Sequence, residues 1–238
     1  VTKEASDMVL EDDNFATIVT AVESGRHIYD NIKKYMRLMI TANFDEFFEI
    51  TASAFAGLPL PILPVQILWI NLVTDGLPAV ALSVDPKEPD LMERSPRDPK
   101  QGLLYGLWFF VLFAATIDFL SNYIPFCWTY FTTGDEVKAR TISFTIVVIF
   151  EFFLAYNCRS ERHSIFGLGL KGLVANRMLF LSVVAGMLLQ LAIIYVPFLQ
   201  IAFHTVPLSA PELALSILGG STALLIFPGK LIGRRSKT

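Results

Sequence analysis

The chain has few charged residues for its length. Lys, Arg, Asp and Glu make up 17% of its 238 residues, against about 25% in soluble globular domains. The hydrophobic fraction is 53%, so the composition excludes an ordinary soluble domain. The formal net charge of −3 also argues against nucleic acid or an anionic surface as a general partner.

Thiolate and imidazole ligands are scarce as well. The two cysteines, Cys127 and Cys158, are too few for a disulfide framework, and we expect both to be free thiols. The three histidines, His27, His163 and His204, all lie outside the long apolar stretches. The sequence therefore argues against a site for a soft metal, which would need sulfur or imidazole ligands.

A secretory signal is missing from the start of the chain. Residues 1–13 are polar and acidic, unlike a signal peptide, and residue 1 is not Met. From Phe15 onward, apolar residues recur near helical spacing. We expect residues 1–31 to be the last strand and helix of a soluble domain whose body lies upstream.

Six long apolar stretches follow this segment. A transmembrane helix needs about 20 mostly apolar residues to cross about 30 Å of hydrocarbon. The stretches that meet this criterion cover residues 35–57, 62–84, 103–124, 141–158, 178–198 and 213–227. The sequence thus predicts an all-α membrane protein, with a six-helix transmembrane bundle formed by residues 32–238.

Lys and Arg are concentrated on one side of these predicted spans. They occur before the first span, in the loops 85–101 and 159–177, and in the tail 228–238. Only Lys138 and Arg140 fall in the opposite loops. The positive-inside rule therefore predicts that both termini are cytoplasmic.

Polar residues interrupt the first two spans, where they are costly and usually face a protein interior or a cavity. Asn43 and Glu46 are three residues apart in the first span and are predicted to share a helix face. Asn71, Thr74 and Asp75 are predicted to share a face of the second span. The alternative interpretations are a polar helix edge and a proline-kinked structural helix.

Helix breakers follow the second polar group. Gly76 and Pro78 weaken the helix, because proline has no N–H and its ring clashes with the carbonyl of Thr74. Irregular backbone at membrane depth is tolerated where it is buried in protein or lines a cavity, as in the ion sites of transporters. The pattern indicates a cation site at this point.

Two further carboxyl groups lie in later spans. Glu151 is flanked by apolar residues and would be neutral unless it met a cation or a donor. A protonated Glu151 bonded to a neighbouring helix is the alternative. Asp118 has no polar companions, and we interpret it as a helix–helix contact. Hard cations such as calcium take about six to eight oxygen ligands, and sodium or protons could use the same groups.

These residues resemble a known family. Residues 65–79 look like the sixth transmembrane helix of sarcoplasmic-reticulum-type calcium pumps, which are P-type ATPases. Residues 4–15 resemble the end of the phosphorylation domain in that family, residues 43–46 the fifth helix, and Glu151 the eighth. The resemblance implies that residues 1–31 are the C-terminal edge of the phosphorylation domain and stalk, and that the six spans are helices five to ten.

The resemblance also implies roles for single residues. It implies one calcium site that uses Asn43, Glu46, Thr74, Asp75 and Glu151. It implies a second calcium site that uses Asn71 and Asp75 together with groups of an upstream helix. Asp45 and Glu49 depart from the family pattern, because the animal pumps have small or uncharged residues there.

Several catalytic motifs of the family are missing from the chain. It has no Asp-Lys-Thr-Gly-Thr phosphorylation motif, no Thr-Gly-Glu actuator loop and no Gly-Asp-Gly hinge motif. The resemblance therefore implies that ATP and Mg²⁺ are bound by upstream nucleotide-binding, phosphorylation and actuator domains of the same protein. The chain alone is expected to hydrolyse nothing.

The predicted function is ion binding within an ATP-driven pump that exports Ca²⁺ from the cytoplasm. The alternatives are a P-type pump for sodium, potassium, protons or manganese, and a stand-alone membrane cation-binding protein without ATPase activity. Membrane lipid and the upstream domains are the expected partners. A multi-pass integral membrane protein is expected, in the plasma membrane if the source is prokaryotic.

Overall fold

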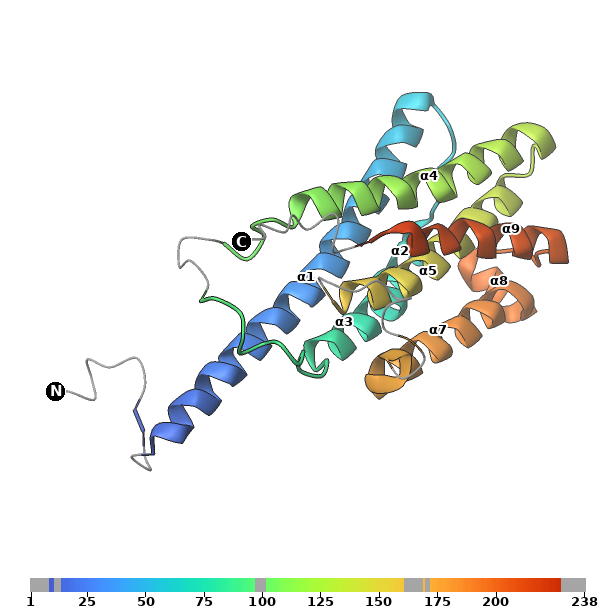
Figure 1. The fold of residues 1–238 in the computed structure, drawn as a ribbon. Helices are drawn as coiled ribbons and strands as arrows, with labels where there is room; N and C mark the ends of the chain where they lie inside the picture. Colours follow the sequence, from blue (N-terminus) through green and yellow to red (C-terminus); the bar gives the residue numbers. More distant parts are fainter. Residues whose placement is uncertain (1–8, 11–13, 97–101, 161–168, 170–171, 228–238) are drawn as a thin grey trace.

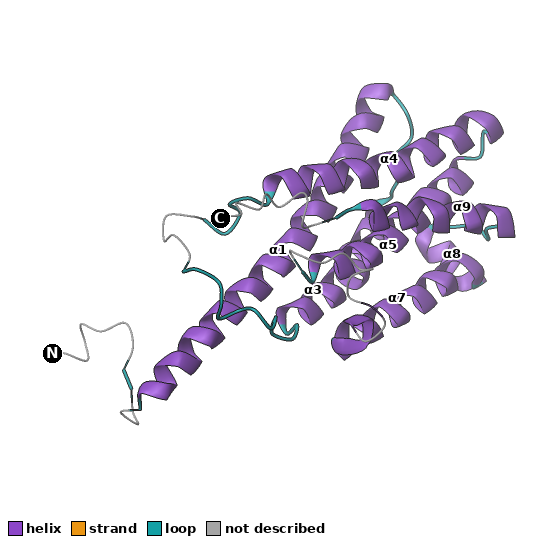
Figure 2. Ribbon diagram, viewed as in Figure 1, coloured by secondary structure: helices purple, strands orange, loops and turns teal. Residues whose placement is uncertain are grey.

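The computed structural model describes residues 9–10, 14–96, 102–160, 169 and 172–227. These residues form a bundle of helices, and the described part of the chain contains no strand (Figures 1 and 2). This agrees with the all-α prediction. Residues 1–8 and 11–13, which carry part of the predicted domain edge, lie outside the described residues.

Helix α1 (Phe15–Ala56) is much longer than a membrane crossing. Its 42 residues span about 63 Å at 1.5 Å per residue, about twice the hydrocarbon thickness. It begins where Asn14 accepts a hydrogen bond from the backbone N–H of Ala16 (3.0 Å). It ends at Gly57, whose φ of 65° requires glycine. Figure 1 shows its first half projecting beyond the bundle. The predicted boundary at residue 31 therefore falls inside one continuous helix.

The second span is built from three consecutive helical segments. Helix α2 (Pro64–Trp69), the π-helix η1 (Ile70–Asp75) and helix α3 (Gly76–Ser83) follow one another without a loop. Together they form one apolar stretch, Pro64–Ser83. The helix weakening predicted near Gly76 is therefore a π-helical turn.

The next two helices differ at their ends from the predicted spans. Helix α4 (Trp108–Thr133) starts later than residue 103 and continues through Pro125. A proline is tolerated there because neighbouring helices can satisfy the backbone carbonyl that it leaves without a donor. Helix α5 (Glu136–Cys158) starts earlier than residue 141, because Asp135 caps it by accepting from the N–H of Lys138 (2.9 Å).

The remaining helices are shorter. Helix α7 (Arg177–Tyr195) ends before residue 198, because Pro197 starts a separate helix, α8 (Pro197–Phe203). Helix α9 (Ala210–Gly220) continues into the 3₁₀-helix η2 (Ser221–Leu225). The last predicted span, 213–227, is therefore one stretch of two helix types.

Four stretches of the described chain are long and apolar enough to cross a membrane. They are Pro64–Ser83, Trp108–Thr133, Glu136–Cys158 and Arg177–Tyr195. The other two predicted spans fall short. Helix α1 carries several carboxyl groups in its second half, and Ala210–Leu225 is shorter than the roughly 20 residues of a full crossing. The membrane bundle is supported, but a count of six spans is not confirmed.

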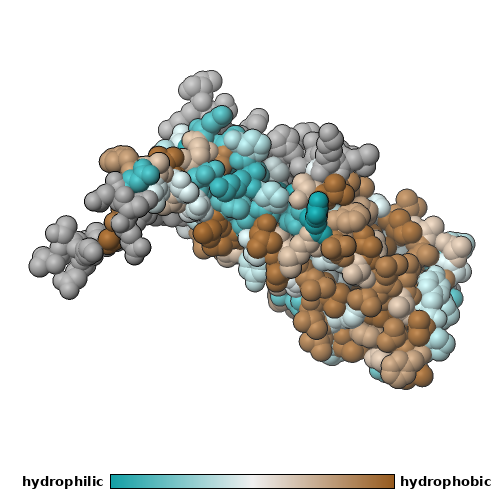
Figure 3. Space-filling view, turned by 90° about the horizontal axis from the view of Figure 1, so that it is seen from below, coloured by the Kyte–Doolittle hydropathy of each residue, from teal (hydrophilic) through white to brown (hydrophobic). Residues whose placement is uncertain are grey.

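Helix α5 lies at the centre of the bundle. In its most apolar window 94% of residues are buried, and its side chains Phe144, Val148 and Phe152 pack in a buried apolar cluster that includes Ile70 and Ile193. The other helices turn apolar side chains outward. Figure 3 shows such side chains over most of one face of the bundle, with hydrophilic residues toward the projecting end of α1. An apolar exterior of this kind suits contact with lipid.

A buried ion-pair cluster joins the ends of several helices at Asp85, which is 2% exposed. Its carboxylate accepts from Lys34 of α1 (2.8 Å), from Arg159 after α5 (2.9 Å) and from Asn176 before α7 (2.9 Å). The ring of His27 lies 2.7 Å from the backbone carbonyl of Asp85. This cluster fixes one end of the bundle.

Candidate cation-binding site

The π-helical turn η1 shapes the middle of the second span. A π-helix pairs residues five apart, so its turn is wider than that of an α-helix, and such turns are frequent at functional sites. Gly76 permits the wide turn, because a Cβ added there would lie 3.0 Å from the backbone oxygen of Asn71. Pro78 has no N–H to offer the carbonyl of Thr74. Backbone and side-chain oxygens therefore gather at this turn.

Thr74 connects η1 to helix α5. Its Oγ1 lies 2.6 Å from Oε2 of Glu151 and 3.0 Å from the backbone oxygen of Ile70. Glu151 is fully buried, and its Oε1 has no hydrogen-bond partner among the described residues. One carboxylate oxygen of Glu151 thus remains available to a ligand.

Asn71 connects the same turn to helix α1. Its Nδ2 lies 3.1 Å and 3.4 Å from the two carboxylate oxygens of Glu46, and it also donates to the backbone oxygen of Ile67 (3.1 Å). Glu46 is 9% exposed. The prediction placed Asn71 and Thr74 on one face, whereas in the structure they contact different helices. The wide π-turn directs Asn71 to α1 and Thr74 to α5.

Asp75 is the most isolated carboxylate of the group. It is 1% exposed, and neither of its side-chain oxygens has a hydrogen-bond partner within the described part of the chain. It interacts electrostatically with Glu46 of α1 and with Glu151 of α5. Three carboxyl groups from α1, η1 and α5 thus interact with one another, and a bound cation or a proton would relieve their mutual repulsion.

Asn43 lies apart from these residues. It is exposed, and its Nδ2 donates to the backbone oxygen of Met39 in its own helix (2.6 Å). The prediction that Asn43 and Glu46 share a face does not agree with the structure. At 3.6 residues per turn, residues three apart are rotated by about 60°, and the buried sector of α1 ends between them.

The sequence analysis did not predict a second cluster of polar residues, which lies between α1 and α4. Asp45 and Glu49 on α1 face Asp118 and Asn122 on α4, and all four side chains are fully buried. Nδ2 of Asn122 lies 3.3 Å and 3.5 Å from the oxygens of Asp45. The prediction that Asp118 has no polar companions is therefore wrong. The four-residue spacing of both pairs was visible in the sequence and could have indicated two facing helices.

Soft-metal ligands play no part in these groups. In the described ranges, no three or more His, Cys, Asp or Glu side chains are arranged to hold a metal ion, so a cation here would also need the amide and hydroxyl oxygens. Cys127 and Cys158 are free thiols, as predicted. His204 is exposed, and His163 lies outside the described residues.

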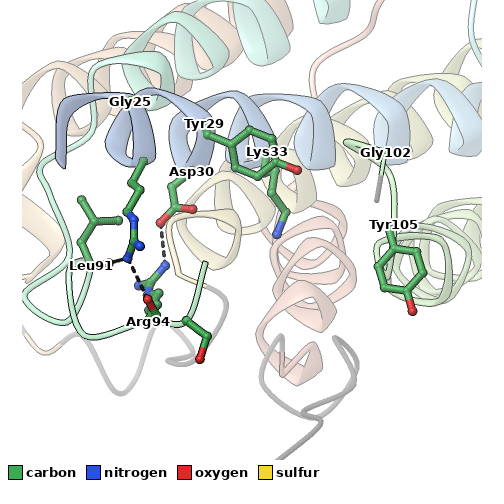
Figure 4. A pocket seen from close by; sticks show the side chains of 10 residues that line it. Gly25, Tyr29, Asp30, Lys33, Leu91, Arg94, Gly102 and Tyr105 are labelled. Atoms are coloured by element: carbon green, nitrogen blue, oxygen red, sulfur yellow. Dashed lines mark hydrogen bonds and ion pairs between the residues drawn. The ribbon is translucent and has the colours of Figure 1, made fainter. Parts of the chain in front are cut away.

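A cavity of about 390 Å³ lies elsewhere, between α1 and the loop after α3 (Figure 4). Arg26 of α1 spans it by donating to the backbone oxygens of Leu91 (3.1 Å) and Arg94 (2.7 Å). The side chain of Lys33 points into the cavity in Figure 4. The cavity therefore connects the projecting half of α1 to the loop and is separate from the cation-binding group.

Arg94 in this loop is surrounded by acidic groups. It donates to Asp30 of α1 (2.6 Å), to Asp90 (2.8 Å) and to Glu88. Burial lowers the pKa of Arg94, but the hydrogen bond with Asp90 and the charges of Asp30 and Glu88 raise that pKa above its ordinary value. Arg94 therefore stays charged and holds the loop against α1.

Comparisons with known proteins identify the family to which the chain belongs. The family described as "Cation transporting ATPase, C-terminus" matches residues 59–230. A calcium-transporting ATPase of Bacillus subtilis is 38% identical over 237 residues, which is 99% of this chain and 26% of that protein. The endoplasmic reticulum calcium ATPase srcA of Aspergillus fumigatus is 36% identical, over 89% of this chain and 25% of that protein.

A mammalian protein matches over a similar range. The calcium-transporting ATPase type 2C member 2 of Rattus norvegicus is 37% identical over 217 residues, 90% of this chain and 23% of that protein. The chain thus spans about a quarter of the length of these relatives. Because the family match covers most of the chain, the chain belongs to the family of C-terminal membrane regions of P-type cation-transporting ATPases.

Proposed function

We propose that this chain is the ion-binding membrane part of an ATP-driven pump that exports Ca²⁺ from the cytoplasm. The observation that carries the proposal is the group of buried oxygens at η1. Glu46, Asn71, Thr74, Asp75 and Glu151 meet there from three helices, and Asp75 has no hydrogen-bond partner within the described residues. Calcium prefers such all-oxygen ligands, and the relatives are named calcium-transporting ATPases.

Asn43 remains a proposed ligand on different grounds. Its family position supports a role at the site, whereas its amide bonds to Met39 on the exposed side of α1. To reach a cation beside Glu46, the side chain would have to leave that carbonyl. Asn43 is therefore the least supported of the six proposed ligands.

The long helix α1 offers a mechanism for coupling. It runs without a break from Phe15 to Ala56 and carries Glu46 in its second half. A movement of its projecting half is therefore transmitted to one side of the site. Pumping requires that calcium affinity differ between two conformations, and a shift of Glu46 relative to Asp75 and Glu151 would produce that difference.

The remaining parts of the proposal concern the whole protein. Residues 1–31 form the edge of a cytoplasmic phosphorylation domain and its stalk, and residues 32–238 form six spans with both termini cytoplasmic. Upstream domains bind ATP and Mg²⁺ and carry the phosphorylated Asp. The coverage of about a quarter of each relative supports such domains. The exposed apolar side chains support contact with lipid, and the plasma membrane is the expected location if the source is prokaryotic.

Phosphorylation by ATP of the intact parent protein in membranes tests the proposal. We expect phosphoenzyme to form when micromolar free calcium is added, and not with sodium, potassium or manganese alone. If phosphoenzyme formed in response to another of these ions, that ion would replace calcium as the proposed substrate. If no ion produced phosphoenzyme, a stand-alone cation-binding protein would be the better account.

A further inference from the structure

The short helix α8 carries apolar side chains that the described residues leave uncovered. None of its residues is buried. Phe198 and Ile201 are each 77% exposed, and Ala202 is exposed beside them. These three residues lie three or four positions apart, so they share one side of the helix, which we call the apolar face of α8. In water, a Phe and an Ile left exposed cost about 1.5–3 kcal/mol each relative to burial.

The opposite side of α8 is occupied by the second span. The ring of Phe203 contacts the ring of Trp69, with centroids 5.4 Å apart. The backbone oxygen of Phe203 accepts a hydrogen bond from Gln66 (2.9 Å). Leu199 packs on the buried apolar cluster of α5. Because these contacts fix the rotation of the helix, α8 cannot turn its apolar face into the bundle.

The length of α7 places α8 at the boundary of the membrane. Helix α7 has 19 residues and is therefore about 28 Å long at 1.5 Å per residue, close to the hydrocarbon thickness of about 30 Å. Helix α8 follows after one extended residue, Val196. Figure 1 shows α8 beside this end of α7. The apolar face thus lies where the hydrocarbon gives way to the lipid headgroups.

Hydrogen bonds hold α8 back against the last turn of α7. The last carbonyls of a helix have no donor within it, and Pro197 has no N–H to offer the carbonyl of Ile193. The hydroxyl of Thr205 donates to that carbonyl instead (2.8 Å), and the amide of Gln200 donates to the carbonyl of Ile194. Protein groups therefore take the place of water at the end of α7, as is required at membrane depth.

Charged residues are missing from this part of the sequence. Residues 178–211 contain no Lys, Arg, Asp or Glu. The next charged residue, Glu212, forms an ion pair with Lys138 at the start of α5 (3.2 Å). A partner that binds through headgroup charge would find no counter-charge on α8. An uncharged, apolar partner fits this surface, and acyl chains are the apolar phase at this depth.

We propose that α8 is an interfacial helix that inserts its apolar face among the phospholipid acyl chains of the leaflet at this end of α7. Helices of this kind bury an apolar face about 5–10 Å into the boundary between headgroups and acyl chains. The contact uses no charge, so it does not depend on anionic lipid. The inference requires that α7 crosses a bilayer, and it holds whichever ion the parent protein transports.

Spin labels on single cysteines of the intact parent protein test the proposal. Every other cysteine, Cys127 and Cys158 included, is replaced by Ala, and the protein is reconstituted in phosphatidylcholine vesicles. The labelled variants are Phe198→Cys and Ile201→Cys. The control is Val137→Cys, which is 37% exposed and lies at the same end of the bundle, because its neighbour Lys138 pairs with Glu212.

Collisions with two relaxing agents report the depth of each label, since oxygen concentrates among acyl chains and a nickel chelate stays in water. We expect the labels at positions 198 and 201 to collide mainly with oxygen, at a depth of about 5–10 Å below the phosphates. The label at position 137 should collide mainly with the nickel chelate. Vesicles that also contain phosphatidylglycerol should give the same depths.

Three results would overturn the proposal. Nickel collisions at position 201 as frequent as at position 137 would place α8 in water. Labels on α8 that neither agent reaches would show that another protein segment covers the apolar face. A depth reached only with phosphatidylglycerol would assign the contact to charged headgroups. If Phe198→Cys failed to fold, Ile201→Cys and Ala202→Cys would decide among these results, and none of the readings depends on calcium binding.

Discussion

Buried carboxylates in this chain differ in whether they have hydrogen-bond and ion-pair partners. Asp85 is enclosed by Lys34, Arg159 and Asn176, each within 2.9 Å of a carboxylate oxygen. Asp75 is equally buried, yet neither of its oxygens has a partner in the described residues. A compensated carboxylate supports the fold, whereas an uncompensated one is retained for a ligand. The two residues should therefore respond oppositely to neutralisation.

Asp85→Asn should destabilise the protein. The change leaves Lys34 and Arg159 buried without their counter-charge, and breaking a buried ion pair in this way costs about 3–5 kcal/mol. Thermal unfolding of the intact protein in detergent would measure the loss. Glu23→Gln is the matched control, because its partner Lys87 is 45% exposed and an exposed pair contributes at most about 1 kcal/mol. Equal effects of the two changes would contradict this account of Asp85.

Thr74→Val should weaken calcium binding and also lower stability, because it leaves a buried carboxylate oxygen of Glu151 without its donor. Valine keeps the shape of threonine but removes the hydroxyl that lies 2.6 Å from Glu151. A hydrogen bond to a charged group contributes about 1.5–3 kcal/mol, so calcium affinity should fall about ten- to hundredfold. Thr20→Val in the exposed part of α1 is the control, since Thr20 bonds only to the backbone oxygen of Ala16 among the described groups. An unchanged affinity would remove Thr74 from the site.

The chemistry of the site could be predicted from the sequence better than its geometry. Polar residues inside apolar stretches are easily recognised in a sequence. Five of the predicted residues lie at the site in the structure, namely Glu46, Asn71, Thr74, Asp75 and Glu151. The rotation of each side chain depends on helix type and on neighbouring helices. For that reason the sequence did not show that Asn71 contacts α1 while Thr74 contacts α5.

At the scale of elements, the second span contains one irregular turn, which lies at the candidate cation site. The π-helical turn η1 separates two ordinary α-helical segments, so irregular backbone is confined to the residues beside the carboxylates. Its geometry depends on close approach of Gly76 to the carbonyl of Asn71. The turn is therefore sensitive to a single added methyl group.

Gly76→Ala should reduce calcium affinity about tenfold, equal to about 1.4 kcal/mol. The new Cβ would lie 3.0 Å from the oxygen of Asn71, so the turn must shift by a few tenths of an ångström. Calcium titration of the intact protein would detect the change. Gly25→Ala is the control, because nothing lies within 4 Å of a Cβ at that position. If both variants bound calcium as the unmodified protein does, the π-turn would have no role in affinity.

Gly220→Ala should destabilise the contact between α9 and α5. An added Cβ would lie 2.5 Å from a side-chain carbon of Ile149 and 2.9 Å from the backbone nitrogen of Phe150, and the backbone cannot move aside easily. Overpacking of this kind costs about 1–3 kcal/mol. A lower unfolding temperature than that of Gly25→Ala would agree, and an unchanged one would show that α9 packs loosely.

Helix positions followed from the apolar pattern, but helix ends did not. The predicted span ends at residue 124, just before Pro125, yet α4 continues to Thr133. Hydropathy does not report whether neighbouring helices can satisfy the carbonyl freed by a proline. The early start of α5 depends on the cap at Asp135 and on the ion pair of Arg140 with Glu136. Hydropathy averaged over a sequence window does not report such local contacts.

At the scale of the whole molecule, α5 is enclosed by the other helices and α1 extends beyond them (Figure 1). The apolar exterior and the basic loops together imply a fixed orientation in the membrane. The proposed six spans and cytoplasmic termini would place the turn between α4 and α5 outside the cell and the loop after α3 inside.

Cysteine labelling of intact cells tests this orientation. In a background with Cys127→Ala and Cys158→Ala, Val137→Cys should react with an impermeant thiol reagent added outside. Lys87→Cys should react only after the membrane is permeabilised. Both side chains are exposed in the structure, at 37% for Val137 and 45% for Lys87. The reverse pattern would invert the topology, and labelling of both from outside would rule out six spans.

Equilibrium binding of radiolabelled calcium to the intact parent protein tests the central claim most directly. We expect saturable binding in the unmodified protein and at least a hundredfold weaker binding in Asp75→Asn, which removes the charge that faces both Glu46 and Glu151. Glu23→Gln should bind calcium as the unmodified protein does. Undiminished binding by a folded Asp75→Asn variant would contradict the assignment of the cation site to the π-helical turn.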